Sequence, residues 1–317
     1  MLSISNYFKN LFMFTFITPT YNRYHTLERL FNSINNQTFK DFDWLIIDDG
    51  SEDQTKELIE SFKSNANFEI TYVYKSNGGK HTALIEAKKH LKQPYVVIID
   101  SDDEVLPDCL EILKKHIETN PNLEEIRGRC VDSKLNLVQK FNFPKNVDYI
   151  DTTWHEMVLK NRNDEELLSC FKLEYYNKAV VLPEKLIFSD KIKFLSEAYF
   201  WSRIKNTKIR YIKDPLRIYH NDSGNSLSNN LEIHNGLYND VVCFKYFLDL
   251  NYMYFFWRPK YFITQYIKLN IACSLIGYGF IKSHFIYDEF VNRFISIMLT
   301  PFSLLFLFKV KFTNKKL

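Results

Sequence analysis

The sequence lacks the features of a secreted, disulfide-framed or zinc-binding protein. It has only five cysteines, and none of them stands in a Cys-x-x-Cys pair. An odd number of scattered cysteines favours neither a disulfide framework nor a zinc site, and it fits a reducing compartment. The chain also contains no internal repeat and no long low-complexity tract.

Long hydrophobic runs are also missing. The stretch 294–308 is almost uncharged, but Pro301 interrupts it, and it is shorter than the roughly 18 residues expected of a membrane-spanning helix. We expect it to dip into a bilayer rather than to cross it. Near the other end, the apolar stretch 11–17 leads directly into Thr18 and Pro19 without a small-residue cleavage site, so we interpret it as a first strand.

Acidic residues are scarce in the C-terminal stretch 251–317. Only Asp288 and Glu289 stand there against Arg258, Lys260, Lys268, Lys282, Arg293, Lys309, Lys311, Lys315 and Lys316. This tail therefore carries about +7, although the whole chain carries only +3. Because its charges lie among aromatic and aliphatic residues, the tail is typical of segments that contact anionic membrane surfaces rather than nucleic acid. A helical packing interface in a homo-oligomer is the alternative.

The first 120 residues show alternating strand and helix patterns. Strands are expected at 14–18, 44–48, 69–74 and 95–100, and helices at 26–36, 53–63, 80–91 and 107–119. Such alternation predicts an α/β fold with a mostly parallel sheet flanked by helices. Ser51 and Gln54 predict a capping box for the second helix, and Pro107 predicts the first turn of the fourth.

Acidic residues directly follow two of these predicted strands, as Asp48-Asp49 and as Asp100-Ser101-Asp102-Asp103. Ligands of open α/β sheets collect outside the carboxyl ends of the strands. Three carboxylates in four residues repel one another without a counter-charge, and oxygen ligands suit Mg²⁺ or Mn²⁺. We therefore predict a metal site at Asp102 with Asp103, and a nucleotide whose phosphates share that metal.

Four predicted strand ends thus converge on one ligand, and their spacing favours a nucleotide sugar. Tyr21 follows the first strand and could stack on a base. Asp49 or Asp48 could accept the imide N–H of uracil, and Asp100 could accept hydrogen bonds from ribose hydroxyls.

Five sequence blocks in this order resemble the family 2 inverting glycosyltransferases of the GT-A fold. The blocks are Thr18-Pro19-Thr20-Tyr21-Asn22-Arg23, Gln37-Thr38-Phe39, Ile46-Ile47-Asp48-Asp49-Gly50-Ser51, Asn77-Gly78-Gly79-Lys80 and Asp100-Ser101-Asp102-Asp103. The resemblance covers roughly residues 14–110. It implies a site for a nucleoside-diphosphate sugar, most often a UDP-sugar, with Pro19, Tyr21 and Asp49 at the base.

The resemblance also implies an acidic catalytic base further along the chain. The family pattern is Glu-Asp-x-x-x-Trp-x-Arg, and the corresponding residues here are Ser196-Glu197-Ala198-Tyr199-Phe200-Trp201-Ser202-Arg203. Glu197 stands where the family has its basic Asp, and Ser196 replaces the preceding Glu. Lys80 is a candidate for a donor phosphate or sugar hydroxyl, and His220 for a further metal contact.

From these features we expect a GT-A domain over residues 1–230, with its donor-binding half at about 12–120 and its acceptor half at about 121–230. Residues 231–317 would form a helical, basic and aromatic extension. The expected activity is metal-dependent, inverting transfer of a sugar to a glycan or lipid-linked acceptor in bacterial surface polysaccharide synthesis. We expect it at the cytoplasmic face of the inner membrane, as a peripheral protein.

Two other classes of function remain open. A nucleotidyltransferase also uses a metal and a nucleotide-binding sheet, but usually has a glycine- and basic-rich loop after its first strand, which residues 18–23 lack. A catalytically silent binder of sugar nucleotides would keep the donor site without transferring anything.

Overall fold

The computed structural model describes residues 13–138, 143–163, 165–184, 186–189, 191–192, 194–220 and 233–313. The chain forms two compact units, each built from separate segments. The first consists of Met1–Thr153, Asn163–Val181 and Asn206–Gly224, and the second of Trp154–Arg162, Leu182–Lys205 and Asn225–Leu317. The boundary predicted near residue 120 separates a donor-binding half from an acceptor half, and the one near residue 230 separates the GT-A domain from its extension. Both stay predictions.

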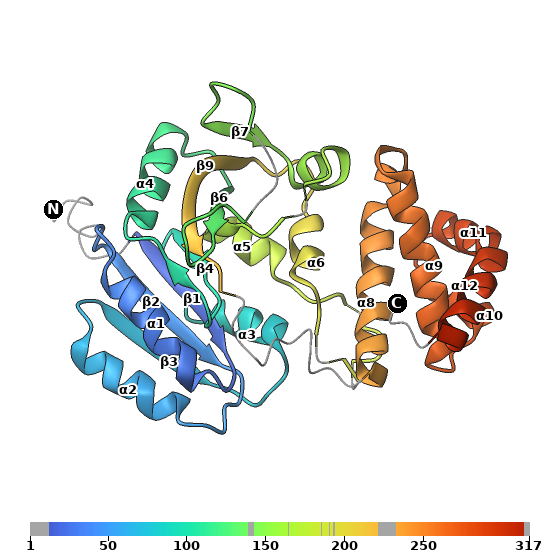
Figure 1. The fold of residues 1–317 in the computed structure, drawn as a ribbon, viewed down its shortest axis with the longest axis horizontal. Helices are drawn as coiled ribbons and strands as arrows, with labels where there is room; N and C mark the ends of the chain where they lie inside the picture. Colours follow the sequence, from blue (N-terminus) through green and yellow to red (C-terminus); the bar gives the residue numbers. More distant parts are fainter. Residues whose placement is uncertain are drawn as a thin grey trace, which may run out of the picture. The chain divides into compact units, whose positions relative to one another are not determined.

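The first unit is built on a mixed sheet (Figure 1). Its described strands are β1 (Phe14–Thr20), β2 (Phe42–Asp48), β3 (Glu69–Tyr74), β4 (Tyr95–Ile98), β5 (Glu104–Val105), β6 (Glu125–Val131), β7 (Tyr149–Thr152), β8 (Leu168–Lys172) and β9 (Ile209–Ile218). They lie in the order β3-β2-β1-β4-β8-β6-β9-β5, and β7 pairs with β9. The strands β1 to β4 are mutually parallel, whereas β8 is antiparallel to both β4 and β6.

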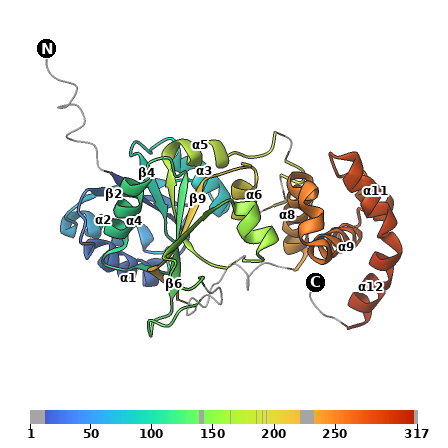
Figure 2. The same cartoon turned by 90° about the horizontal axis from the view of Figure 1, so that it is seen from above.

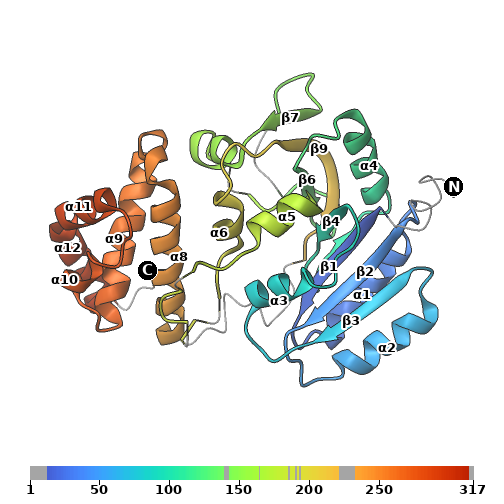
Figure 3. The same cartoon turned by 180° about the vertical axis from the view of Figure 1, so that it is seen from behind.

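The helices in the described part of the first unit are α1 (Tyr24–Asn35), α2 (Thr55–Asn65), α3 (Lys80–Ala87), α4 (Cys109–Thr119) and α5 (Leu173–Ala179). In the two opposite views, α1 and α2 cover one face of the β1–β3 region and α3 lies on the other (Figures 1 and 3). The four strands and four helices predicted for the first 120 residues are therefore present, with ends shifted by a few residues.

Two predicted helix starts are wrong. Helix α2 begins at Thr55, and the predicted capping box does not form. The hydroxyl of Ser51 instead accepts a hydrogen bond from the backbone N–H of Asn22. The carboxylate of Asp53 accepts a hydrogen bond from the backbone N–H of Thr55, the first residue of the helix, at 3.1 Å. Helix α4 begins at Cys109, two residues beyond Pro107.

Aromatic side chains fill the space between the sheet and α1 and α2. The rings of Phe31 from α1 and Phe62 from α2 stack with their centroids 4.2 Å apart. Trp44 of β2 is fully buried beside them, and its indole N–H donates to the Thr18 hydroxyl at 2.9 Å. Burying side chains of this size contributes a few kcal/mol each, so this cluster fixes β1 and β2 against their helices.

The second unit is helical in its described part. It contains the π-helix η3 (Glu156–Lys160), α6 (Glu197–Ser202), α8 (Ile233–Asn251), the 3₁₀-helix η4 (Tyr252–Trp257), α9 (Pro259–Leu275), α10 (Phe280–Ser283), α11 (Phe290–Met298) and α12 (Thr300–Thr313). Helix α9 packs against α8 on one side and against α11 and α12 on the other (Figure 2). Helices α8 to α12 correspond to the predicted C-terminal helical extension, which is rich in aromatic residues.

Among the described helices, none is by itself long and apolar enough to cross a membrane. The predicted apolar run 294–308 instead lies in α11 and α12, which are bent relative to each other by 53°. Pro301 stands in the first turn of α12, where its missing N–H costs no helical hydrogen bond.

Candidate functional site

The parallel strands bring the predicted site residues to one edge of the sheet. Thr20 at the end of β1 is in register with Asp48 at the end of β2, which is in register with Tyr74 at the end of β3. The end of β4 lies on the other side of β1, where Ile98 pairs with Ile17. The loops that follow all four strands therefore leave the sheet together, as the sequence pattern predicts.

Asp49 is buried just beyond β2, and residues of the next loop hold its carboxylate. One oxygen accepts from the Lys75 ammonium at 2.5 Å and from Gly78 N–H at 3.0 Å, and the other accepts from Gly79 N–H at 2.6 Å. A carboxylate has about four acceptor positions, so one remains. Asp48 is also buried and is bonded to Ser51 N–H and to the Tyr72 hydroxyl.

Glycine permits the loops after β2 and β3 to touch. Gly50 has a φ of +88°, and a Cβ atom there would come within 2.8 Å of the backbone nitrogen of Asn77. Gly79, with a φ of +90°, turns the chain into α3. Both are positions where a side chain would be strained.

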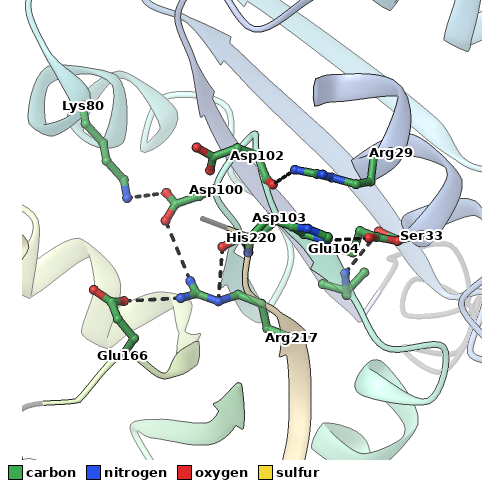
Figure 4. A network of polar contacts seen from close by, with 11 residues as sticks. Arg29, Ser33, Lys80, Asp100, Asp102, Asp103, Glu104, Glu166, Arg217 and His220 are labelled. Carbon is green, nitrogen blue, oxygen red and sulfur yellow. Dashed lines mark hydrogen bonds and ion pairs between the residues drawn. The ribbon is translucent and has the colours of Figure 1, made fainter. Parts of the chain in front are cut away.

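Lys80 is the first residue of α3 and pairs with Asp100 beyond β4 (Figure 4). Because Gly79 binds Asp49 and Lys80 binds Asp100, a single short segment connects the second and fourth strand ends. Arg217 of β9 also approaches Asp100, at 3.8 Å. Burial alone would raise the pKa of Asp100, but the charges of Lys80 and Arg217 outweigh it, and the pKa lies below its ordinary value.

Asp103 lies deeper than Asp100 and takes part in a network with β9 (Figure 4). Its carboxylate is 3.3 Å from the Arg217 guanidinium and accepts from His220 N–H at 2.9 Å. The His220 ring lies 2.7 Å from the carboxylate of Glu104. Burial raises the pKa of Asp103 to about 7, against the opposing charge of Arg217.

Asp102 is the member of the acidic triplet whose nearest cationic partner lies farthest away, whereas Asp100 has the most exposed side chain, at 35%. The Asp102 side chain is 21% exposed, and its carboxylate lies 3.7 Å from the Arg23 guanidinium. Arg29 of α1 donates to the backbone carbonyl of Asp102 and so fixes the turn, while the carboxylate points away from Arg217 (Figure 4).

Arg23, Lys80 and Arg217 supply counter-charges to the acidic triplet, so the repulsion of its carboxylates does not by itself require a metal, and the metal site stays a prediction. In the part of the chain that the structure describes, no group of three or more His, Cys, Asp or Glu side chains gathers as a metal site. Asp102 still fits a hard cation, since its carboxylate is partly open to solvent. Asp103 and His220 are engaged by Arg217 and Glu104, and their roles as ligands stay predictions.

The two residues predicted at the base differ in exposure. Pro19 is buried in β1, at a point beyond the end of its pairing with β4, where a missing N–H leaves no gap in the ladder. Tyr21 is 42% exposed at the start of the following loop, so its ring has a face available to a ligand.

Glu197 belongs to the second unit, where it is the first residue of α6. Ser196 caps this helix, and its hydroxyl accepts from Ala198 N–H at 3.3 Å. Trp201 is buried, and the Arg203 guanidinium lies 5.5 Å from the centre of the Tyr199 ring. The helix start of the family pattern is thus present, and the role of Glu197 stays a prediction.

Sequence reasoning missed three charged residues of this edge: Lys75, Glu166 and Arg217. Arg217 is 96% buried by side chain and contacts Glu166 at 3.3 Å as well as the two aspartates. In the sequence, Arg217 is indicated only by its position between the apolar residues Leu216 and Ile218. Lys75 carried a weaker signal, as a basic residue directly after the third strand.

The sequence model described as glycosyl transferase family 2 matches residues 15–126, which include all four parallel strands and the loops of the site. Over these residues the chain is similar to glycosyl transferase family 2. A curated relative, the GalNAc(5)-diNAcBac-PP-undecaprenol beta-1,3-glucosyltransferase of Campylobacter jejuni, is 28% identical over 209 residues, 64% of this chain and 63% of that protein. The chain therefore spans less than two thirds of that relative's length.

Solved glycosyltransferase structures support the GT-A fold of the sheet-based first unit. Staphylococcus aureus TarS 1-349 in complex with UDP-GlcNAc superposes with a TM-score of 0.55 at 15% identity, over 90% of this chain and 78% of that one. The mannosyltransferase PcManGT of Pyrobaculum calidifontis, in complex with GDP-Man and Mn²⁺, gives 0.53 at 15% identity, over 96% and 88%. At this identity the likeness concerns the fold alone.

Proposed function

We propose that this protein is an inverting glycosyltransferase that moves a sugar from a nucleoside-diphosphate sugar to a hydroxyl group of a glycan or lipid-linked acceptor. The observation that carries the proposal is the convergence of Asp49, Lys80, Asp100 and Asp102 at one edge of a family 2 domain. Such an edge offers acceptors for a nucleoside and cations for phosphates at the same place.

In this proposal the base of the nucleotide lies by Tyr21 and Asp49, and the ribose lies by Asp100. The donor is a UDP-sugar, and the fold match with TarS, whose structure holds UDP-GlcNAc, supports that choice. Lys80 is 21% exposed beside Asp100, so a phosphate could draw its ammonium away from that carboxylate. Arg217 would then keep Asp100 and Asp103 in place.

Asp102 would hold Mg²⁺ or Mn²⁺, and a bound cation would neutralise charge on the departing diphosphate. PcManGT, which has the same fold, was solved with Mn²⁺. We assign Glu197 as the base that removes the proton of the attacking hydroxyl as its oxygen approaches the anomeric carbon. A positioned base contributes on the order of 10² to 10⁴ in rate.

The acceptor we propose is a lipid-linked intermediate of a bacterial surface polysaccharide. The Campylobacter relative is named for an undecaprenol-linked acceptor, which supports this class. The reaction would then take place at the cytoplasmic face of the inner membrane, with the protein in peripheral contact.

A screen of nucleotide sugars for thermal stabilisation, with and without Mn²⁺, tests the donor site, because a ligand that binds only the folded state raises its stability. The nucleotide sugar that stabilises the protein is then incubated with the protein and lipid-linked glycans. Release of a nucleoside diphosphate together with sugar transfer supports the proposal, whereas release of a sugar 1-phosphate, with transfer of the nucleotidyl group, would identify a nucleotidyltransferase.

Glu197→Gln separates transfer from binding. We expect it to keep the donor-induced stabilisation and to lower transfer by about 10² or more. Glu184→Gln, an exposed glutamate of the same unit, is the matched control and should leave both readouts unchanged. Donor binding without any transfer by the wild-type chain, over all acceptors, would instead favour a silent binder.

A further inference from the structure

The helices α11 and α12 have their polar and apolar faces reversed. Asn292, Ser296 and Ser303 are fully buried, and the spacing of 4 and 7 residues places them on one side of the helix pair. A surface helix of a water-soluble domain does the opposite, turning its apolar stripe inward and its polar side chains to water.

The buried polar side chains form a hydrogen-bonded network around Asn270 of α9. The Asn270 carbonyl oxygen accepts from the hydroxyls of Ser296 at 2.8 Å and Ser283 at 3.3 Å, and its amide donates to Ser303 at 3.2 Å. Ser296 also contacts the ring of His284 at 3.0 Å. The inner face of the pair is therefore satisfied within the protein and needs no water.

The outer face is apolar and exposed. It includes Phe290, Phe294, Ile297, Met298, Phe302, Leu305 and Phe306, which are between 50% and 76% exposed. Within each helix these positions recur at spacings of three or four residues, so they form an apolar stripe on α11 and another on α12. A contiguous apolar stripe of this kind marks a surface that another apolar phase covers.

The shape of the pair fits shallow insertion rather than crossing. Helices α11 and α12 have 9 and 14 residues, short of the roughly 20 needed to span a bilayer, and they meet at 53°. Backbone and side-chain polar groups must be satisfied internally in hydrocarbon, which the Asn270 network achieves.

Charge favours an anionic lipid surface over a second copy of the chain as the occupant. The sequence from 290 to 317 contains five basic residues and no Asp or Glu. Two copies would bring these like charges together, whereas an anionic leaflet attracts each of them.

We propose that the outer face of α11 and α12 inserts into one leaflet of an anionic bilayer and anchors the protein there. This inference goes beyond the proposed transfer reaction and does not depend on it, because binding to lipid is measured without any sugar nucleotide.

Vesicle flotation with the full chain tests the anchor, using vesicles of phosphatidylethanolamine and phosphatidylglycerol and vesicles of phosphatidylcholine alone. We expect binding to the first kind and weaker binding to the second. The double variant Phe294→Ser/Leu305→Ser should lower the partition coefficient about tenfold or more, since each exposed apolar side chain adds to insertion.

The matched control is Phe256→Ser/Leu135→Ser, which removes the same two residue types from exposed positions outside α11 and α12. It should bind like the wild type, and an equal loss in the control would overturn the assignment. Sedimentation velocity of the wild type and both variants tests whether a second copy of the chain covers this face instead. A wild-type dimer that dissociates in Phe294→Ser/Leu305→Ser, together with no binding of the wild type to vesicles, would show that it does.

A spectroscopic measurement guards against a folding defect in the double variant. Phe302→Trp should give indole fluorescence that brominated lipids quench beyond the wild-type background, and Phe256→Trp should not. Absence of extra quenching for Phe302→Trp in a chain that still binds vesicles would place the contact elsewhere and refute the proposal.

Discussion

Individual basic side chains balance the acids at the strand ends. Lys75 pairs with Asp49, Lys80 with Asp100, and Arg217 with both Asp100 and Asp103. Asp102 has the weakest pairing, 3.7 Å from Arg23. At this scale each aspartate has a distinct environment, so each substitution has a distinct expected effect.

Asp102→Asn should remove the metal-dependent part of catalysis. We expect transfer to fall by about 10² to 10³, because an electrostatic contribution to the leaving group is lost. The Mn²⁺-dependent part of donor stabilisation should disappear in thermal melts. Asp148→Asn, an exposed aspartate of the same unit, should change neither value. Unchanged Mn²⁺ dependence in Asp102→Asn would remove this residue from the metal site.

The buried side chain of His81 should make the free energy of unfolding depend on pH. It is 3% exposed in the first turn of α3, and burial lowers its pKa from 6.5 to about 4. Between these values the unfolded chain binds a proton that the folded chain excludes, so stability falls as pH falls from 6.5 towards 4. The loss is on the order of 3 kcal/mol at most.

His81→Gln should therefore flatten this part of the stability curve, measured by urea unfolding at a series of pH values. His25→Gln, an exposed histidine of the same unit, serves as the control and should keep the wild-type slope. A wild-type slope in His81→Gln would show that other groups cause the acid sensitivity.

Loops rather than strands decide how closely the site residues approach. The loop after β2 touches the loop after β3 because Gly50 has no Cβ, and the latter loop supplies the amides of Gly78 and Gly79 to Asp49. The parallel sheet sets which loops meet, and the glycines set how tightly.

Gly50→Ala should disturb this contact. The added Cβ would lie 2.8 Å from the Asn77 backbone nitrogen, so we expect a loss of about 1 to 3 kcal/mol in unfolding free energy and weaker donor binding. Gly277→Ala is an informative comparison, because Gly277 has a similar φ of +79° but open space around it. Equal effects of the two exchanges would mean that backbone strain alone, and not the loop contact, matters.

Local sequence patterns predict the elements of the first 120 residues well, because apolar runs and helix periodicity are local signals. Strand β3 has its predicted ends, and Asp49 and Asp100 lie at strand ends as expected. The capping box at Ser51 failed because its hydroxyl binds Asn22, a residue far away in the sequence. Arg217 could not be placed by pattern, since its three acidic partners come from other parts of the chain.

At the scale of the whole chain, the proposed donor site draws on four loops that are well separated in sequence. Hydrogen exchange with UDP and Mn²⁺ should therefore slow in four short segments at once: 20–23, 49–51, 75–80 and 100–103. Ligand binding stabilises local structure against opening, so protection should concentrate in these loops. Protection confined to the second unit would contradict the location of the donor site.

The pairing of Asp103 with β9 also bears on how the protein is made. The partners of this buried carboxylate, Arg217 and His220 N–H, stand more than a hundred positions later in the chain. A nascent polypeptide that has left the ribosome only as far as β6 contains the whole acidic triplet but not the arginine that offsets it. The interactions of Asp103 can therefore form only after β9 has been synthesised. We expect chains truncated before β9 to depend on chaperones.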